Sequence, residues 1–298
     1  MRIGSIGEFG LIEKFKKNIF LGPEVVAGSG DDCAVLKFKP GLYQLFTCDM
    51  IVEGVDFLKD TRPELVGRKA LAVSISDIAA CGGVPKQAVV SFGIPKNTSL
   101  RRVELIAKGL FKTAREFGVS VVGGDISSSR EIVIDVSMLG EVEKERLCLR
   151  GGAKAGDLVM VSGEFGGSIK GKHLNFTPRL KEARFLTRNF KIHAMIDVSD
   201  GLIQDLGHIL EQSASGALIY EDLIPLSRDA AGIKDALCSG EEFELLFTAS
   251  RAEAKKIIRD TRYHFRVIGQ VMPREFGLKL VDRKYRYSRA AMKGFRHF

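Results

Sequence analysis

The sequence has 298 residues, of which 45% are hydrophobic and 28% are charged, and its formal net charge at pH 7 is +8. These proportions are typical of a soluble globular protein, and the length allows two domains with a large buried core. No apolar run approaches the ~20 residues of a membrane span and the first residues lack the apolar stretch of a signal peptide, so we expect a cytoplasmic protein without a membrane segment.

The cysteines point to the same compartment. Five are scattered along the chain without close pairs: Cys33, Cys48, Cys81, Cys148 and Cys238. An odd number without metal-type spacing is not the pattern of a disulfide framework or a zinc site, so we expect reduced thiols.

The first half of the chain alternates helical and extended patterns. Helices are expected over Phe9–Ile19, Pro63–Cys81 and Ser99–Phe117. Pro63 suits a first helical turn, Thr98 or Ser99 can serve as the N-cap of the third helix, and Gly118 stops that helix. Strands are expected over Cys33–Phe38, Tyr43–Cys48, Gln87–Gly93, Val119–Val122 and Ile132–Gly140.

The segment Lys144–Gly156 has little apolar periodicity and contains three glycines, so we place a domain boundary there, between residues 1–143 and 144–298. Beyond it, strands are expected over Leu158–Ser162, Met195–Val198, Glu242–Thr248 and Phe265–Gln270, and helices over Leu202–Ser213 and Arg251–Thr261. Strands and helices mix in both halves, which predicts an α/β or α+β fold.

Seven aspartates lie among small residues, mostly after an apolar run: Asp31, Asp32, Asp49, Asp77, Asp125, Asp197 and Asp200. Carboxylates gathered at the ends of elements repel one another unless a cation lies between them. Magnesium takes oxygen ligands and is commonly held through carboxylates plus substrate phosphates. The pattern therefore predicts a metal-dependent enzyme that acts on phosphates.

Taken singly, these aspartates differ in how strongly they indicate function. Asp77 lies in the almost wholly apolar stretch Ala70–Ala80, where a buried charge must be paired or bind metal. Asp31 and Asp32 are also explained by a tight turn, and Gly124-Asp125 by a loop. Asp200 or Ser199 is also explained as a helix N-cap, although a helix start can equally bind an anion.

Taken together and in order, these pieces resemble the thiamine-monophosphate kinase family, within the superfamily of aminoimidazole ribonucleotide synthetase and selenophosphate synthetase. The matching segments span nearly the whole chain. They are Gly7–Ile12, Gly30–Ala34, Cys48–Phe57, Val73–Ala80, Gly123–Asp125, Ile196–Leu202, Ser239–Leu245 and Lys293–Phe298.

The resemblance implies ATP-dependent phosphorylation of thiamine monophosphate to thiamine diphosphate by direct transfer of the γ-phosphoryl group, assisted by several Mg²⁺ ions. By position, it implies metal ligands at Asp32, Thr47, Asp49, Asp77, Asp125, Asp197 and Asp200, with Cys48 contributing through its backbone. It implies ATP contacts at Gly124, Asp125, Arg150 and Ser199, and thiamine monophosphate contacts at Asp56, Glu241 and Phe295.

The resemblance also implies a two-domain synthetase-like fold and a homodimer. Residues 1–143 would bind ATP and metal and would join the partner's strands in a barrel, while residues 144–298 would form a second α/β domain. No catalytic side chain is expected, because the acceptor is a phosphate oxygen that is already largely deprotonated and phosphoryl transfer needs mainly positioning and charge neutralisation.

Two alternatives stay open from the sequence. One is another ATP-using member of the superfamily, such as an aminoimidazole ribonucleotide synthetase-like enzyme. The other is a non-catalytic nucleic-acid binder, supported by the basic C-terminal segment from Arg283 to Arg296. Nucleic-acid binding would explain the charge but not the aspartates, so we expect neither a nucleic acid nor a membrane as partner.

Overall fold

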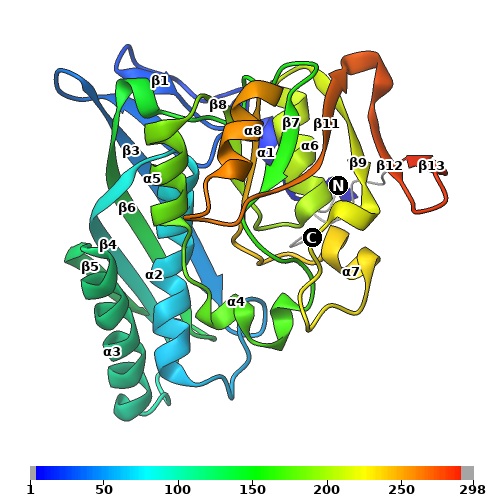
Figure 1. The fold of residues 1–298 in the computed structure, drawn as a ribbon. Helices are drawn as coiled ribbons and strands as arrows, with labels where there is room; N and C mark the ends of the chain where they lie inside the picture. The colour runs from blue at the N-terminus through cyan, green and yellow to red at the C-terminus, as the bar shows by residue number, and fades with distance from the viewer. Residues whose placement is uncertain (1–4, 290–298) are drawn as a thin grey trace.

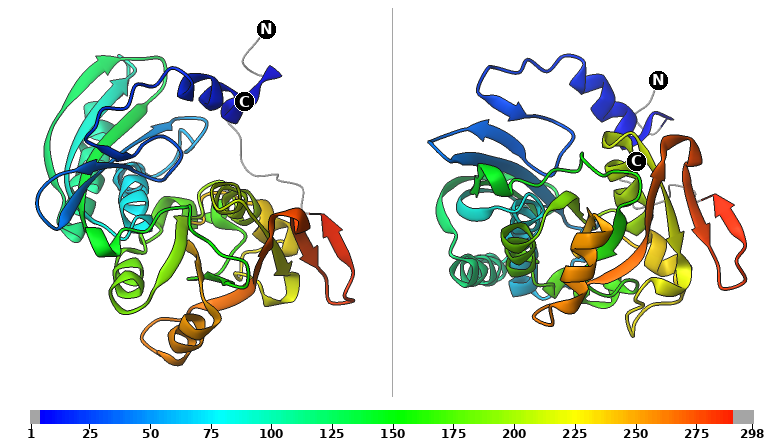
Figure 2. Two further views of the ribbon diagram at one scale, coloured as in Figure 1. Left: turned by 90° about the horizontal axis from the view of Figure 1, so that it is seen from above. Right: turned by 45° about the horizontal axis from the view of Figure 1, so that its top comes forward.

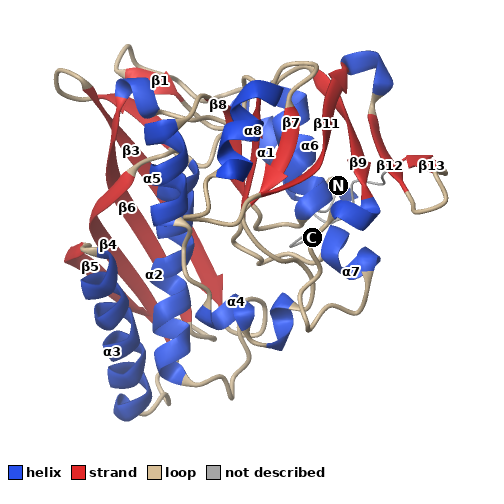
Figure 3. Cartoon of the chain, viewed as in Figure 1, coloured by secondary structure: helices blue, strands red, loops and turns tan. Residues whose placement is uncertain are grey.

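Two β-sheets organise the chain, and the computed structural model describes residues 5–289 (Figures 1 and 3). The first sheet has the order β1-β2-β3-β6-β4-β5, with β1 (Val25–Ala27), β2 (Ala34–Lys37), β3 (Leu42–Val52), β4 (Val84–Ile94), β5 (Ser120–Ser128) and β6 (Val133–Glu143). The second has the order β13-β12-β9-β11-β7-β10-β8, with β7 (Leu158–Val161), β8 (Ile192–Asp197), β9 (Ser215–Tyr220), β10 (Leu245–Ala249), β11 (Arg266–Pro273), β12 (Leu278–Val281) and β13 (Tyr287–Arg289).

Both sheets are mixed, because β4 pairs in parallel with β5 and β9 in parallel with β12 while the other neighbouring strands are antiparallel. The helices are α1 (Gly7–Lys16), α2 (Pro63–Ala80), α3 (Leu100–Phe117), α4 (Lys172–Asn175), α5 (Leu180–Asn189), α6 (Leu202–Gln212), α7 (Ile233–Cys238) and α8 (Arg251–Arg259). Within residues 5–289, no helix has both the length and the apolar character needed to cross a membrane.

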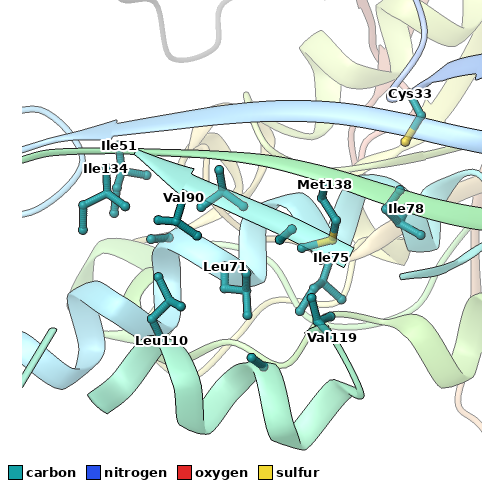
Figure 4. Packing of buried hydrophobic residues seen from close by; sticks show 14 of the residues in the cluster. Cys33, Ile51, Leu71, Ile75, Ile78, Val90, Leu110, Val119, Ile134 and Met138 are labelled. Carbon is teal, nitrogen blue, oxygen red and sulfur yellow. The ribbon is translucent and has the colours of Figure 1, made fainter. Parts of the chain in front are cut away.

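Helices α2 and α3 cover one face of the first sheet, and their apolar side chains form its core with β3, β4 and β6 (Figure 4). The two helices approach closely at Gly67, where an added Cβ would lie 1.9 Å from the carbonyl oxygen of Ile106. The opposite side of α2 packs against α4, α5 and β8, so almost the whole helix is buried. Any polar side chain on α2 therefore needs a partner within the protein.

The other face of the first sheet is open and partly apolar. Phe46, Met50, Val89 and Val122 are 43%, 57%, 42% and 63% exposed, respectively. In the register of the sheet Met50 lies opposite Asp135, which lies opposite Ser91, which in turn lies opposite Asp125. Residues paired across strands point to the same face, so Asp125 belongs to this open face.

Several local predictions are confirmed. Pro63 begins α2, the Ser99 hydroxyl accepts a hydrogen bond from the main-chain N–H of Arg102 at 3.3 Å, and Gly118 ends α3 in the left-handed conformation at φ 69°.

Two local predictions are wrong. Gly123-Gly124-Asp125 lies inside β5 and not at a strand end, because the strand continues to Ser128 as the partner of β4. Strand β10 starts at Leu245 and not at Glu242, because Glu241 and Phe243 have φ values of 60° and 51° that break an extended strand.

Candidate active site

Three carboxylates from distant parts of the chain meet where α2 lies between the two sheets. Asp32 comes just before β2, Asp77 lies in the last turns of α2, and Asp197 ends β8. One oxygen of each lies within 4.8 Å of the others. Asp32 and Asp197 are only 7% and 2% exposed, so these charges are removed from water.

Hydroxyl groups orient two carboxylates of this cluster, those of Asp77 and Asp197, and the carboxylate of the neighbouring Asp49. Each of three aspartates accepts a hydrogen bond from a side-chain O–H. The bonds are Thr47 Oγ1 to Asp77 Oδ2 at 2.5 Å, Ser74 Oγ to Asp49 Oδ2 at 2.7 Å, and Ser76 Oγ to Asp197 Oδ2 at 2.5 Å. Thr47 and Asp49 alternate with exposed residues along β3, so both face α2.

The cluster carries more negative charge than the protein neutralises. Burial raises the pKa of Asp49 to about 6 and that of Asp197 to about 7, with repulsion from neighbouring aspartates adding to the shift. Burial, followed by repulsion from Asp49 and Asp197, raises the pKa of Asp77 well above its usual value. These shifts show that the carboxylates would ionise far more readily beside a cation.

One guanidinium partly compensates the charge. Arg150 Nε and Nη2 donate to Asp32 Oδ1 at 3.0 and 2.6 Å. The second oxygen of Asp32, Oδ2, is buried without a hydrogen-bond partner among the described residues. A Mg²⁺ site fits these observations, because the three carboxylates offer hard oxygen ligands close to one another and one buried oxygen, Asp32 Oδ2, has no partner among the described residues.

A second acidic group lies at the start of α6. Asp205 Oδ2 accepts the main-chain N–H groups of Asp200 and Gly201 at 3.1 and 3.0 Å, and Gln204 Nε2 donates to Asp200 Oδ2 at 3.0 Å. The cap of α6 is thus supplied by Asp205, so the interpretation of Asp200 or Ser199 as the side-chain N-cap is wrong. Asp200, Asp205 and His208 also bring ligand atoms within 4.8 Å of one another.

Gly124 and Asp125 lie away from the cluster in this chain, whereas Cys48, between Thr47 and Asp49, has its main chain beside the cluster and only its side chain directed away. The Cys48 side chain is on the open face, where its Sγ donates to Asp135 Oδ2 at 3.2 Å. Asp125 is on β5, three strand spacings or about 14 Å across the sheet from β3. Gly124 is required there, because an added Cβ would lie 1.8 Å from the carbonyl oxygen of Val90.

A small cavity of about 170 Å³ adjoins the cluster on the side of the predicted substrate residues. Asp56, Glu241 and Phe243 line it together with Asp49 and Asp77. The Asp56 carboxylate accepts the main-chain N–H of Val52 at 2.7 Å, which closes the turn after β3. Phe295, the third predicted substrate contact, lies outside the described residues.

A larger cavity of about 900 Å³ is lined by residues of α1 and α6. The backbone of α1, in dark blue, can be followed in both views of Figure 2. Lys16, the glycine-containing segment 28–30, Arg150 and His208 line this cavity. Its volume is within the range of small-molecule sites. Arg150 therefore stands between the acidic cluster and a space large enough for a nucleotide.

Several functional side chains were not predicted from the sequence. Lys69, Ser74 and Ser76 on α2 and Asp205 on α6 all contact predicted site residues. The available signal was a lysine and two serines within an apolar helix, since such side chains must find partners when the helix is buried.

Comparisons with known proteins agree with this architecture. The model for the AIR synthase related protein N-terminal domain matches residues 30–142, and the model for the C-terminal domain matches residues 152–280. The chain is therefore an AIR synthase-related protein with the two-domain fold of that group.

Individual relatives define the family more narrowly. Thiamine-monophosphate kinases of Buchnera aphidicola (subsp. Schizaphis graminum) and Pyrococcus horikoshii are each 35% identical, over 98% and 90% of both chains. Among solved structures, AaThiL complexed with AMPPCP and TMP has a TM-score of 0.87 and 31% identity, covering 100% of this chain and 99% of that one. Thiamine monophosphate kinase from Aquifex aeolicus has a TM-score of 0.82, also at 31% identity, covering 97% of this chain and 100% of that one. The chain belongs to the thiamine-monophosphate kinase family.

Proposed function

We propose that this protein transfers the γ-phosphoryl group of ATP to thiamine monophosphate and so forms thiamine diphosphate. The observation that carries the proposal is the under-neutralised cluster of Asp32, Asp77 and Asp197, which lies between a large cavity and a small one. Family membership and the AMPPCP and TMP bound by a relative of the same fold support it.

Asp32, Asp77 and Asp197 would hold Mg²⁺ directly, with Asp49, Thr47 and Asp200 beside them. When bound, Mg²⁺ would supply the positive charge that lets the triphosphate of ATP approach the phosphate of thiamine monophosphate and that stabilises the transferring phosphoryl group. The hydroxyls of Thr47, Ser74 and Ser76 keep the carboxylates aimed at the shared space, so little reorganisation is needed.

The two substrates would enter from opposite sides. We assign the nucleotide to the larger cavity, where Arg150 can contact phosphate oxygens. Ser199, the other predicted ATP contact in this half of the chain, lines the small cavity. Asp56 and Glu241 would face the cationic thiazolium ring of thiamine monophosphate. Phe243, stacked on Phe176 with ring centroids 3.9 Å apart, supplies an aromatic wall for that end.

We further propose a cytosolic enzyme divided into residues 1–143 and 144–298, because all five cysteines are free thiols and each sheet has its own core. We also propose a homodimer built on the open face of the first sheet. An edge strand as long as β5 and four exposed apolar residues favour pairing with a second copy. Such pairing would bring Asp125 and Gly124 of one chain towards the partner's site.

A charged residue in this face should separate the subunits. We expect the native protein to elute at twice 32.7 kDa and Val122→Glu to elute as a monomer with activity reduced at least about tenfold, because burying a lone carboxylate is costly. Ile258→Glu on α8 is the matched control, since Ile258 is an exposed apolar residue outside the proposed interface. Light scattering after size exclusion measures the mass, and a Val122→Glu dimer with full activity would contradict the assignment.

A turnover assay with separated products tests the activity itself. We expect thiamine diphosphate only when ATP, Mg²⁺ and thiamine monophosphate are all present, and none with EDTA or with thiamine as the acceptor. If ATP is consumed with another acceptor and thiamine monophosphate is left unchanged, a different ATP-using reaction of the superfamily is favoured instead.

A further inference from the structure

Lys69 is the most deeply buried charged side chain beside the small cavity. It lies on α2 and is only 1% exposed. A buried ammonium is costly unless its charge and its donor hydrogens are satisfied. What Lys69 binds therefore indicates why a lysine lies at a fully buried position of α2.

The Lys69 ammonium joins two segments far apart in the sequence. Its Nζ donates to the carbonyl oxygen of Asp56 at 2.7 Å and to the carboxylate of Glu241, with which it forms an ion pair. Asp56 belongs to the connection between β3 and α2, and Glu241 to the loop before β10. All three residues line the cavity of about 170 Å³.

The loop that carries Glu241 needs such support. Glu241 and Phe243 both have positive φ, at 60° and 51°, and non-glycine residues there cost of order 1 kcal/mol or more each. The main-chain N–H of Glu241 is held by the carbonyl oxygen of Ser199 at 2.5 Å. The Glu241 side chain is 24% exposed, so its carboxylate is fixed by Lys69 yet still reaches the cavity.

We propose that Lys69 is a positioning residue for thiamine monophosphate, acting by holding Glu241 and the Asp56 turn in the arrangement that receives the cationic ring. This inference rests on the proposed assignment of Asp56 and Glu241 to the substrate. Because the ion pair with Lys69 fixes the Glu241 carboxylate at the cavity wall, the ring finds a preformed counter-charge. Lys69 lies away from the larger cavity, so ATP binding does not depend on it.

Substrate kinetics with Lys69→Met test the role. We expect KM for thiamine monophosphate to rise at least about tenfold, while KM for ATP and kcat stay within about threefold, since the variant removes binding of the ring and not of the phosphates. Lys69→Gln keeps hydrogen-bond donors at the position but lacks the charge that pairs with Glu241. It should show the same rise in KM for thiamine monophosphate at nearly unchanged KM for ATP and kcat, and it replaces Lys69→Met in the test if that variant does not fold.

Two further variants separate the outcomes. Arg184→Met is the matched control, because Arg184 is a buried cation that also bonds one glutamate, Glu143, and one carbonyl oxygen, that of Gly82, away from the cavity. It should lower the melting temperature without changing KM. Unchanged KM in Glu241→Gln would overturn the substrate assignment itself. Impaired Glu241→Gln together with unchanged KM in folded Lys69 variants would overturn the role of Lys69.

Discussion

Replacing Asp77 by asparagine should lower kcat at least about 100-fold while the protein remains folded. Asp77 is the carboxylate on which the others converge, because its pKa is raised by burial and by the neighbouring Asp49, Asp197 and Asp32. Asparagine keeps the size and can still accept the hydrogen bond of Thr47 Oγ1, but it lacks the charge that would hold Mg²⁺ in the proposed site. Losing one preorganised group that stabilises transition-state charge typically costs about 10²–10³ in kcat, and losing a metal ligand should cost no less.

The control for this variant is Asp157→Asn. Asp157 is as buried as the site aspartates, at 4% exposure, but it bonds the main-chain N–H of Lys154 at 2.8 Å and the His193 ring at 2.7 Å. We expect this variant to lose stability and keep kcat. The measurement is single-turnover phosphoryl transfer at saturating Mg²⁺ and ATP. Asp77→Asn turnover near the native rate would remove Asp77 from the metal site.

The metal-free protein should become less stable as pH rises from about 4 to about 7, and Mg²⁺ should reverse the loss. Buried carboxylates have raised pKa values, about 6 for Asp49 and about 7 for Asp197, against 3.8 for an ordinary aspartate. In this window the folded state therefore holds more protons than the unfolded state. The stability that these groups contribute is fully present below about pH 4, and it is lost as the pH rises through their pKa values in the folded state.

Thermal melting in EDTA and in excess Mg²⁺ measures this linkage. A ligand at 100 times its Kd stabilises by about 2.7 kcal/mol, which raises the melting temperature by roughly 4 °C for a chain of this size. We expect that gain at pH 7.5 and a much smaller one at pH 4.5, where the carboxylates are protonated. Asp77→Asn should melt higher than the native protein in EDTA at pH 7.5, because it removes one repelling carboxyl group. A Mg²⁺ effect independent of pH would show that the metal binds elsewhere.

The sequence predicted the elements that depend on local chemistry. Pro63 at the start of α2 and Gly118 after α3 have the positions that their backbone preferences require. The buried position of Asp77 could be inferred because the stretch Ala70–Ala80 around it is almost wholly apolar. Short strands such as β9 and β12 were missed, as was the polar helix α5, because their pairing and packing partners lie far along the chain.

In the site as well, features that depend on local sequence could be predicted, and features that depend on contacts between distant segments could not. The aspartates could be predicted as a group, since hard ligands at element ends are visible in the sequence. The partners that orient them, such as Ser74, Ser76 and Lys69, could not, because these contacts depend on which segments the fold brings beside α2. The distance of Asp125 from the cluster also needed the strand order of the first sheet.

The most direct test of the central claim is a crystal structure with Mn²⁺ in place of Mg²⁺ and a non-hydrolysable ATP analogue, with anomalous difference density collected at the manganese edge. Manganese accepts the same carboxylate and phosphate oxygens and identifies the metal positions without bias. If the proposed metal site is correct, we expect an anomalous peak between Asp32, Asp77 and Asp197, with phosphate oxygens of the analogue beside it. Anomalous peaks confined to other residues, with these three carboxylates free of metal, would contradict it.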